Sequence, residues 1–285
     1  MSSSISQKIR DGYQKFSKGQ KKIANAICND YDKVAYTTAA RLGEMVGVSE
    51  STVVRFAIEL GYDGYSDFQH AIQELVRSKL TLNQRIQVTK QRIGTSDVVA
   101  SVIESDLAKL RYTLETIDRQ TFHSVVDAIL AARTIYVMGA RSSMCLAYFM
   151  HHSLGLIYDN VRLIQPTSTG EVFEQLFSVG KGDVVIAYSF PRYSTKMINA
   201  LNYAKQQGAT IVVVTDSEAS PLAEYATHLL TAQSDMVSFT DSLVAPLSIS
   251  NAIIVEIANR RGGAITDRFN RLEQIFSEYN IFVKR

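Results

Sequence analysis

The chain has 285 residues, 46% of them hydrophobic, and a formal net charge of +2 at pH 7. This length allows a sizeable core and predicts two domains, and the balanced charge excludes a polybasic tail that binds by charge alone. The two cysteines, Cys28 and Cys145, lie far apart without metal-ligand spacing, so we expect no disulfide framework, no metal and no cofactor.

The sequence shows no targeting or membrane segment. Its start, MSSSISQKIR, lacks the apolar core of a signal peptide. No apolar run approaches the ~18 residues that a membrane span needs. We therefore expect a cytoplasmic protein with no membrane partner.

Basic side chains are concentrated near the N-terminus. The first thirty residues contain Lys8, Arg10, Lys15, Lys18, Lys21 and Lys22. The acidic residues among them are Asp11 and Asp30. This excess fits a polyanionic partner, and a solvated protein surface explains it about as well.

Residues 1–79 predict an all-helical domain with short connections. Apolar residues recur at helical spacing from Ile5 onward, without strand-like alternation. Four positions are suited to cap helices: Ser17, Thr37 or Thr38, Ser49 and Ser66. Gly47 suits a tight turn, and Gly61 suits the left-handed position after a helix.

Residues 80–96 are polar and weakly periodic, which indicates a linker to a second domain over 97–285. A long amphipathic helix is expected first, over 97–117. Five short β-branched runs follow: TIYVMGAR (134–141), VRLI (161–164), DVVIAYSF (183–190), TIVVVTDS (210–217) and THLL (227–230). Helical periodicity follows each of the first four, which predicts an α/β domain whose parallel sheet is covered on both faces.

A last long helix is expected over residues 241–261. It is apolar nearly all round past Pro246, and a helix of this kind should be buried. In a chain of this size, a subunit interface is a candidate for covering it.

The segment from Thr37 to Leu60 reads as helix, glycine-containing turn, helix, the order of a helix-turn-helix motif. The buried stripe of its second helix is Val53, Phe56 and Leu60. The outward side chains are then Glu50, Ser51, Thr52 and Arg55, with Ser49 as cap and candidate phosphate contact. Such side chains suit base readout in the major groove, and a solvated face of a packed helix explains them about equally well.

Two strand ends carry hydroxyl and arginine side chains. GARSSMC (139–145) places Arg141, Ser142 and Ser143 after one strand, and YSFPRYST (188–195) places Ser189, Arg192 and Ser194 after a later one. Ligands of open α/β sheets bind outside such strand ends, where helix N-termini attract anions. An ordinary serine cap explains each junction taken alone.

Catalysis by this chain would need a general base, and the candidates are Glu171, His151 and His152. The two histidines lie within an apolar helical segment, where core or interface packing accounts for them. Glu171 near a helix N-terminus is accounted for by the helix dipole. We therefore expect no catalytic residues.

The stretch GVSESTVVRFAIELGYDGYSDF resembles the helix-turn-helix domain of the RpiR/MurR family of bacterial transcription regulators. The spacing G-V-S-x-x-T-V-x-R-F and L-G-Y-x-G-Y-x-x-F carries the resemblance, which extends from about Ile5 to Val76. It implies DNA binding by Ser51, Thr52 and Arg55. Lys21 and Lys22 are implied as phosphate contacts.

Residues from about 105 to 262 resemble the sugar isomerase (SIS) domain of the same regulators. The resemblance implies a doubly wound parallel sheet and a phosphorylated sugar held by serines after the first strand and by a Ser-x-Ser-Gly-x-Thr loop after the third. The matching residues are Ser142, Ser143, Ser189 and Ser194. Pro191 and Arg192 stand where the loop pattern has Ser and Gly, and Arg192 could supply a bidentate charged donor instead.

Taken together, these features predict a homodimeric or homotetrameric regulator, more often a repressor than an activator in such a family. It would bind a palindromic operator in double-stranded DNA under the control of a phosphorylated sugar or similar small anion. Two alternatives stay open: a sugar-phosphate isomerase with an appended helical domain, and a DNA-binding protein that ignores metabolites.

Overall fold

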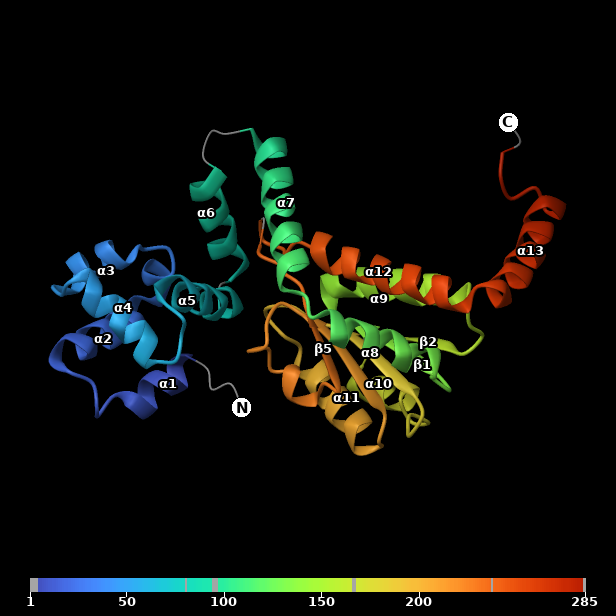
Figure 1. The fold of residues 1–285 in the computed structure, drawn as a ribbon, viewed down its shortest axis with the longest axis horizontal. Helices are drawn as coiled ribbons and strands as arrows, with labels where there is room; N and C mark the ends of the chain where they lie inside the picture. Colours follow the sequence, from blue (N-terminus) through green and yellow to red (C-terminus); the bar gives the residue numbers. More distant parts are fainter. Residues whose placement is uncertain (1–4, 80, 94–96, 166–167, 237, 284–285) are drawn as a thin grey trace. The chain divides into compact units, whose positions relative to one another are not determined.

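The computed structural model describes residues 5–79, 81–93, 97–165, 168–236 and 238–283 (Figure 1). The chain divides into two compact units, Met1–Arg92 and Ile93–Arg285, and each is described by itself. Within the described ranges, none of the helices combines the length and the apolar character needed to cross a membrane.

The first unit is helical, as predicted. Its helices are α1 (Ile5–Gly12), α2 (Lys18–Val34), α3 (Ala39–Val46), α4 (Glu50–Glu59) and α5 (Tyr65–Lys79). Phe56 of α4 lies at the centre of the core, with edge-to-face ring contacts to Phe16 at 5.1 Å and to Phe68 at 5.9 Å. Such contacts stabilise a core beyond simple apolar burial.

The segment predicted as a linker contains a helix. Helix α6 (Leu82–Ile93) occupies most of residues 80–96, and residues 80 and 94–96 lie outside the described ones. Thr81 starts it as a cap, because its hydroxyl accepts from the Gln84 N–H while the Gln84 side chain accepts from the Thr81 N–H. This reciprocal capping compensates for the weak apolar periodicity of the segment.

The second unit contains a five-stranded parallel sheet, which confirms the predicted α/β class. Its strands are β1 (Ile135–Gly139), β2 (Val161–Ile164), β3 (Val184–Tyr188), β4 (Thr210–Thr215) and β5 (His228–Thr231), in the order β2-β1-β3-β4-β5. Strands β1 and β3 are buried at every residue, since helices cover both faces of the sheet.

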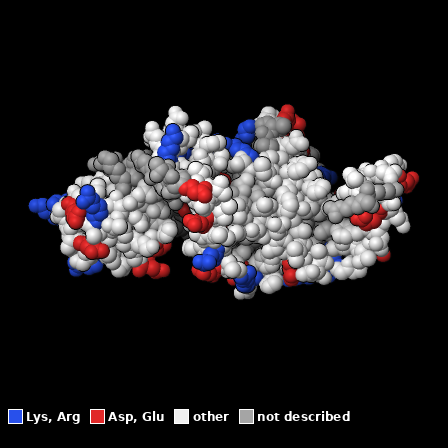
Figure 2. Space-filling view, turned by 90° about the horizontal axis from the view of Figure 1, so that it is seen from above, with Lys and Arg blue, Asp and Glu red and all other residues white. Residues whose placement is uncertain are grey.

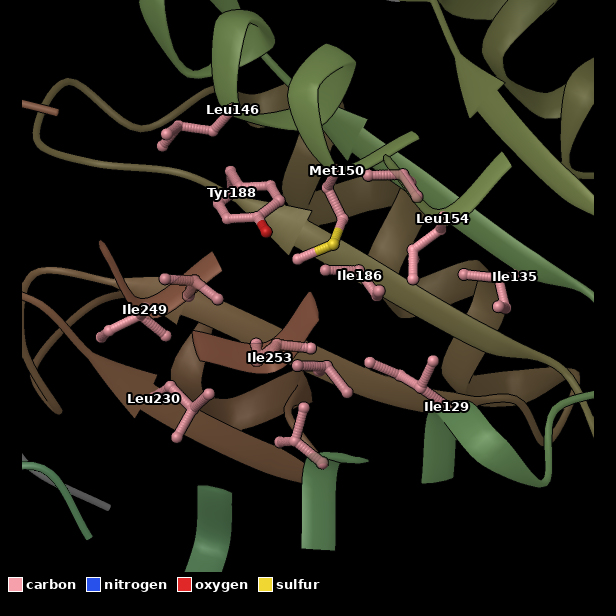
Figure 3. Close-up of a cluster of buried hydrophobic side chains, with 14 of the residues drawn as sticks. Ile129, Ile135, Leu146, Met150, Leu154, Ile186, Tyr188, Leu230, Ile249 and Ile253 are labelled. Atoms are coloured by element: carbon pink, nitrogen blue, oxygen red, sulfur yellow. The ribbon is translucent and has the colours of Figure 1, made fainter. Parts of the chain in front are cut away.

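Helices α8 (Arg119–Leu130), α9 (Met144–Gly155) and α12 (Val244–Arg261) cover one face of the sheet. Figure 3 shows side chains of α9 and α12, among them Met150 and Ile253, meeting Ile186 and Tyr188 of β3. Helices α10 (Thr169–Gln175) and α11 (Thr195–Gln206) cover the opposite face. Helix α7 (Val98–Thr116) precedes α8, and one-turn 3-10 helices span Arg141–Ser143 and Ala223–Tyr225.

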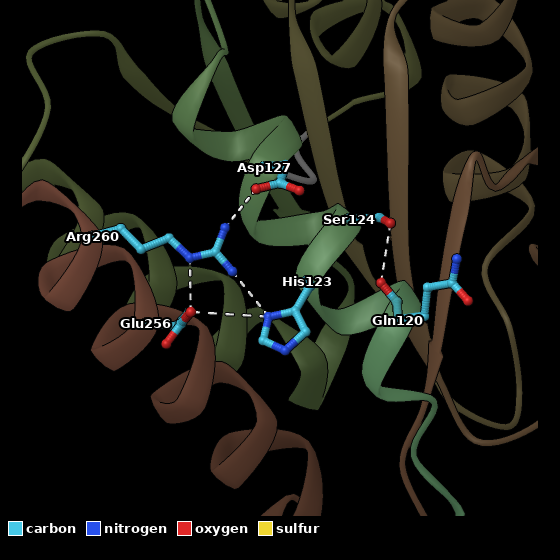
Figure 4. A network of polar contacts seen from close by, with 6 residues as sticks. All are labelled: Gln120, His123, Ser124, Asp127, Glu256 and Arg260. Atoms are coloured by element: carbon cyan, nitrogen blue, oxygen red, sulfur yellow. Dashed lines mark hydrogen bonds and ion pairs between the residues drawn. The ribbon is translucent and has the colours of Figure 1, made fainter.

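Helix α12 is buried on one side only, although its sequence predicts burial nearly all round. Ile249, Ile253 and Ile257 are buried against the sheet, while Val255 is 58% exposed. A polar network ties its outer side to α8. Arg260 donates to Asp127 at 2.5 Å, to His123 at 2.9 Å and to Glu256 at 2.7 Å (Figure 4).

The helix predicted over residues 241–261 ends at Arg261 as α12, but it is not the last helix of the chain. Helix α13 (Gly263–Glu278) follows α12 after a turn at Gly262, whose φ is +47°. Arginine side chains secure this corner to α9. Arg268 donates to the carbonyl oxygens of Leu156 and Gly155, and Arg261 donates to that of Ile157. The last carbonyl groups of α9, which lack partners within the helix, are thereby satisfied.

Candidate functional site

Two glycines shape the turn between α3 and α4. Gly47 adopts the left-handed conformation, with φ +68°, and its N–H donates to the carbonyl oxygens of Glu44 and Gly43. Gly43 lies beneath the turn, where an added Cβ would come 2.8 Å from the carbonyl oxygen of Val48. The sequence indicated Gly47, whereas the need for Gly43 depends on packing of the turn against α3.

The front of α4 presents a cluster of hydroxyl groups. Ser49 caps the helix by accepting from the Thr52 N–H at 3.3 Å, and its Oγ lies 2.9 Å from Ser51 Oγ and 2.8 Å from Thr52 Oγ1. Arg55 Nε donates to the Ser51 carbonyl oxygen at 3.2 Å, which folds the side chain along the helix. Ser49, Ser51 and Arg55 are exposed, and Thr52 is half-buried.

The start of α2 lies beside this cluster. A Cβ added to Gly19 would stand 3.6 Å from Thr52 Cγ2, and one added to Gly47 would stand 3.6 Å from Lys22 Nζ. The Lys22 ammonium group is therefore next to the turn that leads into α4. Lys21 lies over the ring of Tyr13, the residue that follows α1, 5.6 Å from the ring centroid.

In the second unit, the two predicted ligand loops begin side by side. Strands β1 and β3 are neighbours, and their last residues, Gly139 and Tyr188, are paired in register. The chain leaves β1 toward β2 on one side and returns to β3 on the other. This change of direction forms the crevice in which open α/β sheets bind ligands.

The loop after β1 approaches its own strand closely. A Cβ on Gly139 would stand 2.5 Å from the carbonyl oxygen of Ser143, so this position requires glycine. Arg141 and Ser142 are exposed, whereas Ser143 is buried at the start of α9. The Ser143 hydroxyl makes no capping hydrogen bond to α9. The loop therefore presents one buried and one exposed hydroxyl.

The loop after β3 is held at both ends. Ser189 is buried, and its N–H donates to the Val214 carbonyl oxygen at 3.2 Å. Tyr193 donates to Asp216, which follows β4, at 2.7 Å. Ser194 precedes α11 without a capping hydrogen bond from its side chain. The loop after β3 is thus tied to β4 and to the residue that follows β4.

Both loops contain an arginine in the left-handed backbone region. The φ angles are +58° at Arg141 and +70° at Arg192, and among the described non-glycine residues Asn280 alone shares this feature. Each non-glycine residue in this region lowers the stability of the fold by about 1 kcal/mol, and backbone strain of this kind clusters at functional sites. Arg192 also has a buried Nη1 without a hydrogen-bond partner. The backbone at position 192 therefore has the conformation that glycine adopts most readily.

A small open pocket lies between these loops and α10. Its polar lining comes from Ser194 and Lys196 with Gly139 and Ala140, and its apolar lining is Met138, Ile164, Val172 and Met197. Ser194 is the predicted ligand residue in this lining. Lys196 was missed, although its place two residues after Ser194, on the first turn of α11, is the signal that could have indicated it.

The candidate catalytic residues do not meet in space. Glu171 forms a reciprocal capping box with Ser168 at the start of α10. His151 and His152 lie seven and eight residues after Met144, about 10 Å along α9 and on the other face of the sheet. Burial lowers the pKa of His151, so its imidazole is held neutral by packing.

Family models match both units. Residues 3–79 match the helix-turn-helix domain of the rpiR family, and residues 128–256 match the SIS domain. The HTH-type transcriptional regulator HexR of Escherichia coli K12 is 24% identical over 284 residues, 95% of this chain and 94% of its own length. An uncharacterized HTH-type transcriptional regulator of Haemophilus influenzae is 29% identical over 236 residues, 80% of each chain.

A solved structure shares the fold over almost the whole length. The Vibrio vulnificus NanR protein complexed with ManNAc-6P has a TM-score of 0.62 and 21% identity, covering 98% of this chain and 99% of NanR. The two family models together span most of the chain, and the relatives extend along nearly all of it. The chain belongs to the rpiR family of DNA-binding transcription regulators that carry a SIS domain.

Proposed function

We propose that this regulator is a repressor of sugar-metabolism genes, that it binds a palindromic operator as a homodimer or homotetramer, and that a phosphorylated sugar in the β1–β3 crevice controls its affinity for DNA. The main support for control by a ligand is the pairing of Gly139 with Tyr188. Because these residues end neighbouring strands, both serine-bearing loops begin next to each other at the same edge of the sheet.

The front of α4 supports a base-reading role. Ser51, Thr52 and Arg55 are small or flexible hydrogen-bonding side chains over the first two turns, as major-groove readout requires. Arg55 is proposed to hold a guanine after releasing the Ser51 carbonyl oxygen. Ser49, Lys21 and Lys22 are proposed as phosphate contacts, because phosphate contacts position a reading helix without specifying sequence.

Two copies would read a two-fold symmetric operator. Equivalent groove contacts are then separated by one helical turn of DNA, ~34 Å, or a multiple. Helices α7 and α12 support pairing through the second unit, since Val99 is 66% exposed on α7 and Val255 is also exposed on α12. Figure 2 shows a broad area of the second unit without Lys, Arg, Asp or Glu.

The crevice supports a phosphorylated ligand. Ser142, Ser143, Ser189 and Ser194 provide hydroxyls near the starts of α9 and α11, and helix N-termini attract anions. Arg141, Arg192 and Lys196 are proposed to add positive charge, with the buried Arg192 Nη1 taking a phosphate oxygen as its missing partner. NanR, which shares the fold, is complexed with ManNAc-6P in its solved structure.

We propose that the SIS domain binds its ligand without converting it. HexR, which matches 95% of this chain, is named as a transcriptional regulator, and Glu171 is engaged in a capping box. A ligand then changes DNA affinity only by binding the DNA-competent and DNA-incompetent arrangements differently, a coupling of ~1–3 kcal/mol.

The proposed role as a repressor is tested with a reporter gene placed behind the operator. Expression of the reporter should rise when the gene for this protein is deleted.

The first experiment is a thermal-stability titration with a panel of sugar phosphates. A specific ligand at 100 times its dissociation constant stabilises by ~2.7 kcal/mol. We expect the double variant Ser189→Ala, Ser194→Ala to lose this effect and to keep operator binding. Ser178→Ala, at an exposed serine outside the crevice, is the control. An undiminished ligand effect in the double variant, or loss of its DNA binding, would contradict the proposal.

A further inference from the structure

The C-terminal end of the chain exposes an unusual amount of apolar surface. Helix α13 extends away from the sheet after α12 (Figure 1). Not one of the residues Thr266 to Val283 is buried, although the segment includes Phe269, Leu272, Ile275 and Phe276. Tyr279 is 69% exposed and Val283 is 93% exposed. A helix of this length is marginal in water unless it packs against another element.

The base of α13 is held rigidly. Ile265 is buried, and Arg268 is bonded to Leu156, Gly155 and Asp159 at the end of α9. Three hydrogen bonds from one guanidinium group, one of them to a carboxylate, fix the direction in which the rest of the helix leaves the domain. The exposed apolar face is therefore presented in a defined orientation.

The apolar residues of α13 follow the spacing of a helix-pairing seam. The seam consists of Phe269, Leu272, Phe276 and Tyr279, separated by three, four and three residues, and it continues the line of the buried Ile265. This alternation is the repeat with which helices pack against one another. Gln274 lies on the opposite side of the helix, where an exposed polar residue is expected.

We propose that this seam binds the same seam of a second copy of the chain, with the two helices antiparallel. The spacing reads identically in both directions, so a two-fold axis at Gln274 brings Phe269 opposite Tyr279 and Leu272 opposite Phe276. Every seam residue then meets an apolar partner, as an isologous interface requires. The contact is separate from the α7 and α12 surfaces and does not depend on the DNA or ligand proposals.

The charges beside the seam favour a second copy over a strongly charged partner. The charged residues beside the seam are of both signs, with Arg268 and Arg271 preceding Glu273 and Glu278 along the helix. An acidic or a basic partner would meet like charges on this surface, whereas a copy of the same helix carries both signs. The edge-to-face contact of Phe276 with Phe282 also folds the tail back beside the seam, which enlarges the apolar surface.

The test measures self-association of the full chain by sedimentation velocity over a range of concentrations. Leu272→Glu and Phe276→Arg each place a charge in the seam, and each should raise the dissociation constant of this contact by about 30-fold or more. Gln274→Glu is the matched control on the opposite side of the helix and should leave it unchanged. Because these side chains are not buried within the chain, all three variants should fold, which circular dichroism checks.

The double variant Leu272→Glu, Phe276→Arg tests the antiparallel register. In that register each introduced carboxylate faces an introduced guanidinium group, and association should recover at least ten-fold relative to either single variant. A double variant that associates more weakly than both would overturn the proposal, since parallel pairing opposes like charges. Unchanged association of the single variants at every concentration, or a wild-type chain that is monomeric throughout, would also overturn it.

Discussion

The two proposed binding regions are built in contrasting ways. The front of α4 is exposed, and its side chains bond mainly to one another within a single helical turn. The crevice at the end of β1 and β3 is assembled from residues about fifty positions apart, with two serines buried and two arginines in left-handed backbone conformations.

The difference fits what each region is proposed to bind. A reading helix must enter a groove, so its functional atoms lie at the surface and carry no backbone strain. A small anion is enclosed by the protein, so the donors must be held in position before it arrives, and strained residues are tolerated there. Substitutions should therefore affect the two regions through different observables.

The largest expected effect concerns the glycines on which the regions depend. Gly139→Ala should destabilise the second unit by about 3 kcal/mol, because its Cβ would lie 2.5 Å from a backbone oxygen. Gly43→Ala should destabilise the first unit by about 2 kcal/mol for the same reason. Urea denaturation followed by circular dichroism measures both.

The matched controls are glycines with open space around them. Gly155→Ala in the second unit and Gly64→Ala in the first add a methyl group that meets nothing within 4 Å. They should be neutral or stabilising by about 0.5 kcal/mol. Equal stability of Gly139→Ala and Gly155→Ala would show that the β1 loop is free to move away from its strand.

The second effect concerns base readout. Arg55→Ala should weaken operator binding by about 2 kcal/mol and leave binding to random duplex nearly unchanged, since a guanine contact acts only on the specific site. Fluorescence anisotropy with both duplexes measures this difference. Equal weakening on both duplexes would place Arg55 on the phosphate backbone.

Lys22→Ala provides the comparison for Arg55. If Lys22 contacts a phosphate, its removal should weaken binding to both duplexes alike. The salt dependence of binding should then fall by about one ion. The ammonium group lies beside the turn before α4, so its removal should leave the fold intact.

The third effect separates strain from function in the crevice. Arg192→Gly relieves the left-handed backbone, and we expect stability within about 0.5 kcal/mol of wild type because glycine is also more flexible when unfolded. Affinity for the phosphorylated sugar should fall about ten-fold as the guanidinium group is lost. Asn280→Gly is the control, with the same backbone change far along the chain from the crevice.

The smallest effect is a dependence on pH. Burial lowers the pKa of His151 and of His228 below the ordinary value of 6.5. As the pH falls, the unfolded chain therefore takes up these protons before the folded chain does. The two neutral histidines contribute fully to the free energy of unfolding above pH 6.5. This contribution is lost as the pH falls through the pKa of the unfolded chain and then that of the folded chain. His151→Gln with His228→Gln should flatten this decline in urea titrations between pH 7 and 5, and His70→Gln, at an exposed histidine, should not.

Local patterns in the sequence were sufficient for much of the architecture. The apolar stripe of α4, its Ser49 cap and the β-branched runs of the strands depend on neighbours in sequence, and all appear in the structure. Helix α13 was not singled out, although Phe269, Leu272 and Phe276 recur at helical spacing in the sequence. Helix α6 was missed because capping, more than periodicity, supports it.

The crevice was predictable only in part. Its serines could be located from the strand ends, but the pairing of Gly139 with Tyr188 depends on contacts distant in sequence. The left-handed backbone at Arg192 lies next to Tyr193, which ties the loop to Asp216. These features follow from tertiary structure, which local periodicity does not report.

The hydrogen bond between Tyr188 and Ser250 bears on how the second unit would respond to salt. It joins the last residue of β3, directly before Ser189, to the middle of α12 over 2.9 Å, entirely within the core. Burial raises the pKa of Tyr188 well above its usual range, so both partners stay neutral at any physiological pH. Added salt weakens DNA binding by competing for phosphates, yet it leaves an uncharged, buried contact unaffected. Raising the ionic strength should therefore weaken the contacts to phosphate groups while β3 and α12 remain joined through this hydrogen bond.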